Sequence, residues 1–319
     1  MGKESRSSDK SIIIINDSNE NWQWYDYKFP KFSSYQIINI SPKKFKNWLR
    51  FIYKIYSSDI VVIRGFSLWF LLLPILKPHK HRNVAIEMGF SEWDDTIYRR
   101  LLKVYIQLVI NKYDLIHVFT SNLKDFVLEE FEYRNKVLVH GITFSYRGYS
   151  NINEIERTNK IIAAGRVGRD FYEIKNLSKD SSFNYKIIGC EGEDTANLEF
   201  VQQLPLDEFL IELKSAKLVI IPLIDSKLPS GIRMLWMAIE LSVPVIIKKS
   251  RGNSPYLVDH LYREILEYTS EVDNWDEMLI EKLNYYEMNN LLDYNRMYVE
   301  ENFNGNKLCN DLETEILNL

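Results

Sequence analysis

Short runs of aliphatic and β-branched residues alternate with longer segments of helical periodicity along the chain of 319 residues. Continuous apolar runs separated by helix-length segments are typical of parallel strands that are covered on both faces. In the first half the predicted strands lie in SIIIIND, YQIINI, SSDIVVIRG, RNVAIEM, YDLIHVFTS and KVLVHGI. The pattern therefore predicts an α/β fold that begins with a doubly wound parallel sheet.

The same pattern starts again after residues 145–160, a polar and aperiodic segment that suits a linker between domains. KIIAAG, NYKIIG, KLVIIPL and VPVII predict strands, with helices in PLDEFLIELKSA and GIRMLWMAIEL. The second half is therefore expected to be another Rossmann-like sheet, facing the first across a cleft. The expected parts are a disordered tail over 1–10, a first domain over 11–149 and a second domain over 150–294.

Composition narrows the functional classes. Hydrophobic residues make up 46% of the chain and charged residues 26%, which is ordinary for a globular protein. The net charge of -4 gives no field that would hold a nucleic-acid backbone, so no nucleic-acid partner is expected. Cys190 and Cys309 are the two cysteines, too few for a disulfide framework, which favours the reducing cytoplasm.

The apolar segments are short. The first ten residues, MGKESRSSDK, lack the apolar centre of a secretory signal. The longest apolar run, from Phe66 to Leu76, is about half of the ~20 residues that a spanning helix needs. We therefore expect a chain that does not cross a membrane.

A glycine and three cations follow the predicted strand Lys160 to Ala164, where ligands of doubly wound sheets bind. They are Gly165, Arg166, Arg169 and Lys175. Guanidinium groups bind phosphate through paired hydrogen bonds and lysine adds a point charge, so this cluster suits a diphosphate. The alternative is that one or more of these cations pairs with Asp170 or Glu173.

A second candidate site lies in the segment PSGIRMLWMAIELSVPVII. Ser230 precedes a predicted helix, Gly231 permits close backbone approach, and the first turn, with Ile232, leaves N–H groups that can bind an anion. Arg233 adds a charge in that turn, and Pro244 ends the helix. The alternative is an ordinary helix with Ser230 as its N-cap.

The second half of the chain carries, in this order, a strand, GRVGRD, a second strand, IIPL, SGIR, a helix and PVI. This order resembles the donor-binding domain of GT-B glycosyltransferases, especially the group-1 (GT4-like) superfamily. The ending YVEENFNGNK resembles the closing segment of that superfamily, where the last helix returns to the first domain; here that helix would span about 295–319. The resemblance covers roughly residues 110–319. It implies a nucleotide-diphospho-sugar donor in the second domain, an acceptor in the first, and sugar transfer in the cleft.

The resemblance also assigns residues. Arg166 and Lys175 match the family's diphosphate-binding Arg and Lys, and Ser230 and Gly231 match its phosphate-facing turn. Many group-1 enzymes carry a Glu-x7-Glu motif here, whereas this chain has Pro229 and Met237 in the two glutamate positions. That departure puts the usual sugar and ribose contacts in doubt. Glu240, one turn later, could replace a ribose contact or be an exposed helical residue.

Sugar transfer requires a stabilised leaving group, which the cations and helix N–H groups supply without a metal or a cofactor. An inverting reaction also needs a base for the acceptor hydroxyl. Glu87 follows a predicted strand and is the preferred base; Asp17 is the alternative, although it could equally cap a turn. The predicted catalytic residues are Glu87, Asp17, Arg166 and Lys175. The predicted donor-binding residues are Gly165, Arg166, Arg169, Lys175, Ser230, Gly231, Ile232, Arg233, His140 and Glu240.

Two basic segments, 41–56 and 77–82, predict a peripheral contact with an anionic membrane surface at the inner face of the membrane. Basic and aromatic residues on an amphipathic helix suit such a surface and a lipid-linked acceptor. The alternative places Ile52 and Ile55 in the buried stripe of a sheet-covering helix, together with Phe45, Trp48 and Leu49.

The sequence therefore favours a cytoplasmic, metal-independent glycosyltransferase that builds a surface polysaccharide or another glycoconjugate on a glycan or lipid-linked acceptor. One alternative is a nucleotide-sugar epimerase of related plan. Another is a catalytically degenerate GT-B protein that binds a sugar nucleotide. A dinucleotide dehydrogenase is disfavoured because no Gly-x-Gly-x-x-Gly follows a predicted strand.

Overall fold

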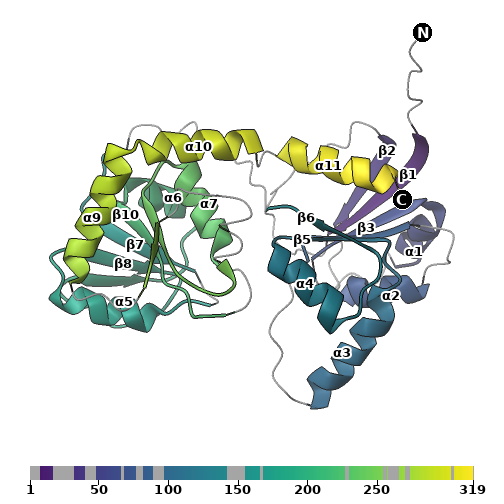
Figure 1. Cartoon of the computed structure of the whole chain (residues 1–319), viewed down its shortest axis with the longest axis horizontal. Coiled ribbons are helices and arrows are strands. Elements are labelled where there is room, and N and C mark those ends of the chain that lie inside the picture. The colour runs from purple at the N-terminus through teal and green to yellow at the C-terminus, as the bar shows by residue number, and fades with distance from the viewer. Residues whose placement is uncertain are drawn as a thin grey trace, which may run out of the picture. The chain divides into compact units, whose positions relative to one another are not determined.

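The chain forms two compact units in a computed structural model (Figure 1). Unit 1 comprises Met1–Thr143 and Gly305–Leu319, and unit 2 comprises Phe144–Asn304. The structure describes residues 8–16, 32–39, 48–65, 68–76, 82–88, 97–141, 155–165, 168–226, 230–253, 257, 266–269, 274–302 and 305–318.

The described strands of unit 1 form one parallel sheet in the order β2-β1-β3-β4-β5-β6. Their bounds are β1 Ser8–Asn16, β2 Phe32–Asn39, β3 Ile60–Arg64, β4 Arg82–Ile86, β5 Leu115–Val118 and β6 Lys136–Val139. β1 begins inside the segment that we expected to be a tail, because Ser8 already pairs with Phe32 of β2.

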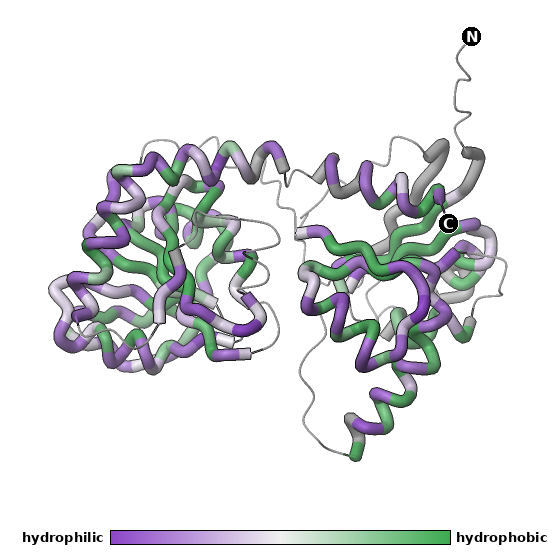
Figure 2. The backbone as a smooth tube through the Cα atoms, viewed as in Figure 1, coloured by the Kyte–Doolittle hydropathy of each residue, from purple (hydrophilic) through white to green (hydrophobic). Residues whose placement is uncertain are grey.

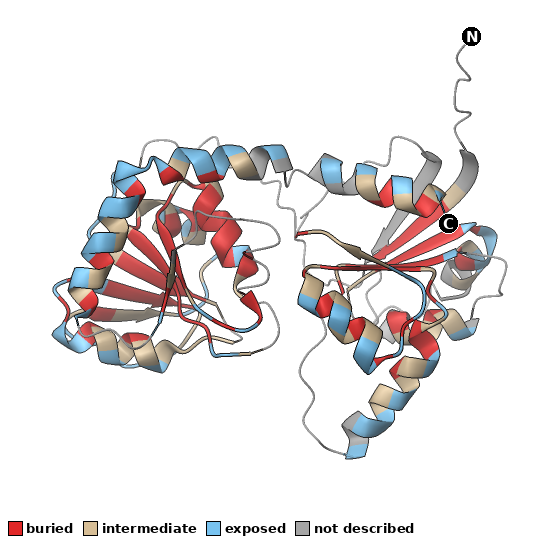
Figure 3. Cartoon of the chain, in the orientation of Figure 1, coloured by how far each residue is buried: buried red, intermediate tan, exposed pale blue. Residues whose placement is uncertain are grey.

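Both faces of this sheet are covered, as the continuous apolar runs require. Side chains alternate across a strand, so Ile12 and Ile14 of β1 face one side, where they share a core cluster with Leu312 and Ile316. Those two residues belong to α11 (Gly305–Leu317), the last helix of the chain. Ile15, on the opposite face of β1, is also fully buried, and Figure 3 shows buried positions along these strands.

The other described helices of unit 1 are α1 Trp48–Ser57, α2 Leu68–Leu76, α3 Ile97–Ile110 and α4 Ser121–Glu130. In α1, Ile55 is buried, as the sheet-covering interpretation expects, while Tyr53 is 73% exposed. The predicted membrane-contacting segments fall partly outside the described residues, at 41–47 and 77–81. Arg82, the last residue of the second segment, pairs with Asp114 at 2.9 Å. None of the described helices is long and apolar enough to span a bilayer.

Unit 2 contains a second parallel sheet, in the order β12-β11-β10-β7-β8-β9 among the described strands. Its strands are β7 Lys160–Ala164, β8 Asn184–Ile188, β9 Leu198–Val201, β10 Leu218–Ile221, β11 Val245–Lys248 and β12 Leu266–Tyr268. Its helices are α5 Phe171–Leu177, α6 Leu206–Ser215, α7 Ile232–Glu240, α9 Trp275–Met288 and α10 Leu291–Asn302, with a 3-10 turn, η3, over Ser178–Asp180. The predictions did not include β9 and β12, the two edge strands.

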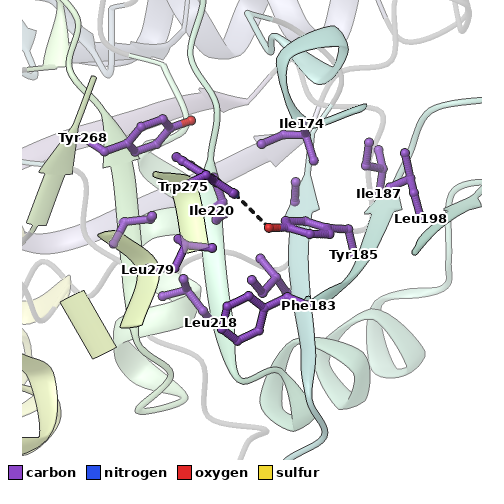
Figure 4. Packing of buried hydrophobic residues seen from close by; sticks show 13 residues of the cluster. Ile174, Phe183, Tyr185, Ile187, Leu198, Leu218, Ile220, Tyr268, Trp275 and Leu279 are labelled. Atoms are coloured by element: carbon purple, nitrogen blue, oxygen red, sulfur yellow. Dashed lines mark hydrogen bonds between the residues drawn. The ribbon is translucent and has the colours of Figure 1, made fainter. Parts of the chain in front are cut away.

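The core of unit 2 joins its strands to α9 (Figure 4). Trp275, the first residue of α9, donates its indole N–H to the Tyr185 hydroxyl of β8 at 2.8 Å. Buried aromatic side chains with polar atoms need such a partner, so this hydrogen bond fixes how the first turn of α9 sits on the sheet. Figure 2 shows the matching pattern in both units, with hydrophobic residues along the strands and both hydrophobic and hydrophilic residues on the helices.

Candidate active site

In unit 2 the loops that follow β7 and β10 join at the carboxyl edge of the sheet. The Asp170 N–H donates to the Pro222 carbonyl at 2.8 Å, and the Ile224 N–H donates to the Gly168 carbonyl at 3.2 Å. Arg169 and Leu223 form an antiparallel bridge between them. This edge is where ligands of parallel α/β sheets bind.

Two glycines make this junction compact. Gly231 has φ +76°, and a Cβ there would lie 2.6 Å from Cγ2 of Ile221 and 3.1 Å from Nη2 of Arg169. Gly165, directly after β7, has φ +133°, and its Cβ would lie 2.8 Å from Nε of Arg169. A side chain at either position would be strained and would collide with a neighbour, so glycine is required for both reasons.

Arg169 holds the junction together from inside. Its Nε donates to the Ala164 carbonyl at 3.1 Å, and its Nη1 lies 3.4 Å from the Gly168 carbonyl and 3.3 Å from the Ser230 hydroxyl. Burial lowers the pKa of the Arg169 guanidinium to about 10, so it remains charged at neutral pH. The structure thus gives Arg169 a role in shaping the junction, in addition to the charge for which we singled it out.

The turn before α7 is held by an asparagine that the sequence analysis did not identify. Asn253 is fully buried; its Nδ2 donates to the Ser230 carbonyl at 2.7 Å and its Oδ1 accepts from the Ser230 N–H at 2.8 Å. These two bonds fix Ser230 by its backbone. Gly231, not Ser230, is the N-cap of α7, and no side chain caps this helix. The interpretation of Ser230 as an ordinary N-cap was therefore wrong.

The remaining predicted site residues of α7 differ in burial and in their distance from the start of the helix. Ile232 is buried and Arg233 is exposed, both in the first turn. Met237, in the second glutamate position of the family motif, is buried in the core. Glu240 ends the helix, about 14 Å along its axis from Gly231, so it lies at the opposite end from the anion-binding turn.

Lys175 lies in the last turn of α5 and is half-buried. Its ammonium makes no hydrogen bond or ion pair with another residue in the described part of the chain. Arg166, the other cation that matches the family's pair, lies outside the described residues.

Asp170 and Glu173 both pair with Lys248 at the end of β11, at 3.6 Å and 3.0 Å. Asp170 also caps α5 by accepting the Glu173 N–H at 3.1 Å. The Tyr268 hydroxyl of β12 lies 3.4 Å from the same Glu173 carboxylate. Asp170 and Glu173 therefore pair with Lys248, a lysine outside the predicted cluster of cations.

In unit 1, Glu87 lies directly after β4, with its side chain against Arg64 at the end of β3. Nε of Arg64 lies 2.5 Å from Oε2 of Glu87, and both side chains are largely buried. Glu87 has φ +55°, a left-handed conformation that is uncommon for a residue with a side chain and often marks functional sites. Arg64 therefore positions the Glu87 carboxylate at the carboxyl ends of β3 and β4.

His117 of β5 fixes the Glu87 backbone. The Glu87 N–H donates to Nδ1 of His117 at 3.0 Å, and Nε2 of His117 donates to the His140 carbonyl at 2.9 Å. This network assigns the neutral Nε2–H tautomer to a fully buried imidazole. His117 thereby joins the ends of β4, β5 and β6, and only its place within an apolar strand could have drawn attention to it.

His140 follows β6, and its imidazole has two partners in unit 1. Its Nδ1 donates to the Gly141 carbonyl at 2.9 Å, and its Nε2 lies 3.6 Å from Oδ2 of Asp311 on α11. Burial lowers the pKa of His140, and the Asp311 carboxylate opposes that shift. Asp17, the alternative base, lies outside the described residues.

No metal-binding arrangement stands out in the part of the chain that the structure describes: no group of three or more His, Cys, Asp or Glu side chains could hold an ion there. The described residues offer a carboxylate paired with Arg64 in unit 1, and in unit 2 a helix N-terminus beside a buried guanidinium. These are groups that move protons and stabilise anions.

Solved structures resemble the chain over nearly its whole length. An α-glucosyltransferase in complex with UDP and a 13-mer DNA has a TM-score of 0.62 and 12% identity, over 97% of this chain and 99% of that chain. An E. coli structure named for trehalose-6-phosphate and bound with UDP-2-fluoro glucose has a TM-score of 0.64 and 10% identity, over 96% and 98%. A protein described as a UDP-N-acetylglucosamine 2-epimerase from Listeria monocytogenes has a TM-score of 0.55 and 13% identity, over 97% and 96%.

No protein-family model matches the chain, and the search of curated proteins gives no significant match. Identities this low establish shared architecture. The predicted fold class, α/β with two Rossmann-like parallel sheets, is confirmed, and the solved structures that the chain resembles include GT-B glycosyltransferases. The chain has the GT-B type of fold.

Proposed function

We propose that the chain is a glycosyltransferase that moves a sugar from a nucleotide-diphospho-sugar to a glycan or lipid-linked acceptor, without a metal ion. The observation that carries this proposal is the junction in unit 2, where Gly165, Arg169, Ser230 and Gly231 come together at the carboxyl edge of the sheet. Two proteins that share the fold are bound with UDP or a UDP-sugar analogue.

Leaving-group stabilisation follows from this junction. Negative charge grows on the diphosphate as the sugar departs, and preorganised positive groups lower the energy of that state. The first turn of α7 contributes backbone N–H groups, and Asn253 and Arg169 hold that turn in place. Arg166 and Lys175 add the charges that match the family's diphosphate-binding pair.

Acceptor activation is assigned to unit 1. Glu87 carries a carboxylate that contacts Arg64 on a backbone held by His117, and it would accept the proton of the attacking hydroxyl. Asp17 remains the alternative base. The proposed product is an extended glycan or glycoconjugate in surface polysaccharide synthesis, made at the cytoplasmic side.

Replacing Glu87 with glutamine is expected to lower turnover about 10²–10⁴-fold, because the amide cannot take a proton but can still bond to Arg64. The matched control is Glu132→Gln, an exposed glutamate of unit 1 that also has a left-handed backbone, with φ +52°. Steady-state rates of nucleotide release, with thermal melting of both variants, would test this. Equal rates for Glu87→Gln and wild type would remove Glu87 from the mechanism.

Nucleotide sugars are expected to raise the melting temperature, since a ligand that binds only the native state stabilises it. A thermal-shift panel of UDP, GDP, ADP, CMP and dTDP sugars, with EDTA present, would identify the donor. The stabilising sugar is then tested for slow release of nucleoside diphosphate in water.

The two steps separate the competing functions. Stabilisation with diphosphate release supports a transferase. Stabilisation with interconversion of the sugar and no release would indicate an epimerase, and stabilisation without any chemistry would indicate a binding protein. A panel without any shift would contradict the donor site itself.

A further inference from the structure

His117 is a fully buried histidine in β5, a strand whose other residues are apolar. Buried polar groups are costly unless they are hydrogen-bonded, so a histidine at such a position needs partners. Both ring nitrogens have one on the backbone: Nδ1 accepts the Glu87 N–H, and Nε2 donates to the His140 carbonyl. An apolar side chain could fill the same space but could make neither bond.

His117 binds the chain where it leaves β4. The ladder between β4 and β5 pairs Val84 with Leu115 and Ala85 with Ile116. Beyond it, the Glu87 N–H donates to the His117 ring at 3.0 Å, and the Met88 N–H donates to the His117 carbonyl at 3.1 Å.

These two N–H groups flank the Cα atom of Glu87, so one residue holds the backbone on both sides of it. The φ of +55° at Glu87 is unfavourable for a residue with a side chain. Such a conformation persists only where the surrounding structure holds it in place. The bonds to His117 provide that support.

The backbone conformation of Glu87 determines where its carboxylate lies. A change of φ swings the Cα–Cβ bond, so a released backbone would carry Oε2 away from Nε of Arg64, which is now 2.5 Å distant. A displacement of about 1 Å in a reacting group can lower a rate about 10²-fold, even when its cause lies away from the chemistry. The His117 ring thus controls a coordinate on which proton transfer depends.

We propose that His117 is a positioning residue for Glu87. Its Nδ1 lone pair keeps the Glu87 peptide in the conformation that presents the carboxylate to the acceptor hydroxyl. The imidazole is fully buried with both nitrogens bonded to backbone groups, so it acts through Glu87 and not on the acceptor itself. The proposal rests on the proposed function, in which Glu87 is the base.

Two substitutions separate the two ring nitrogens. Asparagine has an oxygen at the place of Nδ1, so His117→Asn can still accept the Glu87 N–H but is too short for the His140 carbonyl. Glutamine has an amide nitrogen at the place of Nε2, so His117→Gln can still donate to the His140 carbonyl but loses the acceptor for the Glu87 N–H. We expect His117→Gln to lower kcat for nucleotide release about 10²-fold, while His117→Asn stays close to wild type.

Tyr133→Phe is the matched control for the loss of a buried hydrogen bond in the same sheet. The Tyr133 hydroxyl lies 3.1 Å from the Tyr113 carbonyl and 3.3 Å from the Lys136 carbonyl, before the amino ends of β5 and β6. This variant should lower the melting temperature and leave kcat unchanged.

A second control places His117→Gln in the Glu87→Gln background. A residue that acts through another should have little further effect once that other residue is replaced. The KM for the nucleotide sugar and the stabilisation by it should be the same in all variants, because the donor site is assigned to unit 2.

Equal kcat values for the Asn and Gln variants of His117, or losses of kcat that follow the melting temperature in every variant, would overturn the positioning role. So would an undiminished effect of His117→Gln in the Glu87→Gln background. If the substituted chains do not fold, the histidine nitrogen spectrum of the wild type decides. A protonated Nδ1 at His117 would exclude the bond to Glu87, and an unprotonated Nδ1 would support it.

The outcomes also separate this role from the proposed function. A wild type that stabilises with no nucleotide sugar and releases no nucleotide would contradict both. A wild type that releases nucleotide, with a His117→Gln variant that does so equally fast, would contradict the role of His117 alone.

Discussion

Replacing Lys175 with alanine is expected to lower nucleotide release about 10²–10³-fold, because each preorganised group that stabilises a developing negative charge contributes on that scale. The fold should be unaffected, since the Lys175 ammonium makes no hydrogen bond or ion pair with the described residues. The measurement is a rate of diphosphate release together with a thermal melt. Arg166→Ala is expected to act in the same direction.

The control for this prediction is Lys179→Ala, a nearby exposed lysine whose Nζ bonds to the Asn176 side chain at 3.1 Å. It removes the same charge from the same region and should leave the rate unchanged. If Lys175→Ala and Lys179→Ala both release diphosphate at the wild-type rate, the phosphate site lies elsewhere.

Replacing Gly231 with alanine is expected to destabilise unit 2 and to weaken nucleotide binding. The left-handed backbone at φ +76° costs about 1–2 kcal/mol for a residue with a side chain. A Cβ placed 2.6 Å from Ile221 adds about 1–3 kcal/mol of overpacking. The free energy of unfolding, measured by urea titration, should therefore fall by about 2–5 kcal/mol in total.

Gly65→Ala separates the two contributions. Gly65 has φ +72°, close to that of Gly231, but a Cβ there would meet nothing within 4 Å. It should show the backbone cost alone, and the difference between the two variants measures the steric cost of the junction. Equal losses would mean that the contact of Gly231 with Ile221 and Arg169 is not tight.

The strands were predictable where they are buried on both faces. Runs such as Ile12–Ile15 and Ile60–Ile63, short and rich in β-branched residues, are typical of strands inside a covered sheet, and the structure has them there. The edge strands β9 and β12 were missed because Leu198–Val201 and Leu266–Tyr268 are short and interrupted by acidic residues. An edge strand has one neighbour and more contact with water, so its sequence carries a weaker apolar signal.

The residues of the candidate site were predictable only where their role depends on their neighbours in the sequence. Gly231 stood out because a glycine before a helix has a limited set of uses. Asn253 and His117 act through partners far away in the sequence, Ser230 in one case and Glu87 in the other. Lys248 likewise meets Asp170 and Glu173 only after β11 is placed near β7, with β10 between them.

By itself the sequence determined the two-sheet α/β plan. The length and period of an apolar run distinguish a buried strand from a helix, and both are properties of consecutive residues. Only the tertiary structure decided the order of the strands, the use of Arg169 inside the junction, and the exposure of Leu101 and Leu108 on α3. The reason is physical. The hydrogen bonds and the burial of a side chain depend on the residues that surround it in the folded protein. Strand pairing brings those residues together from distant parts of the sequence.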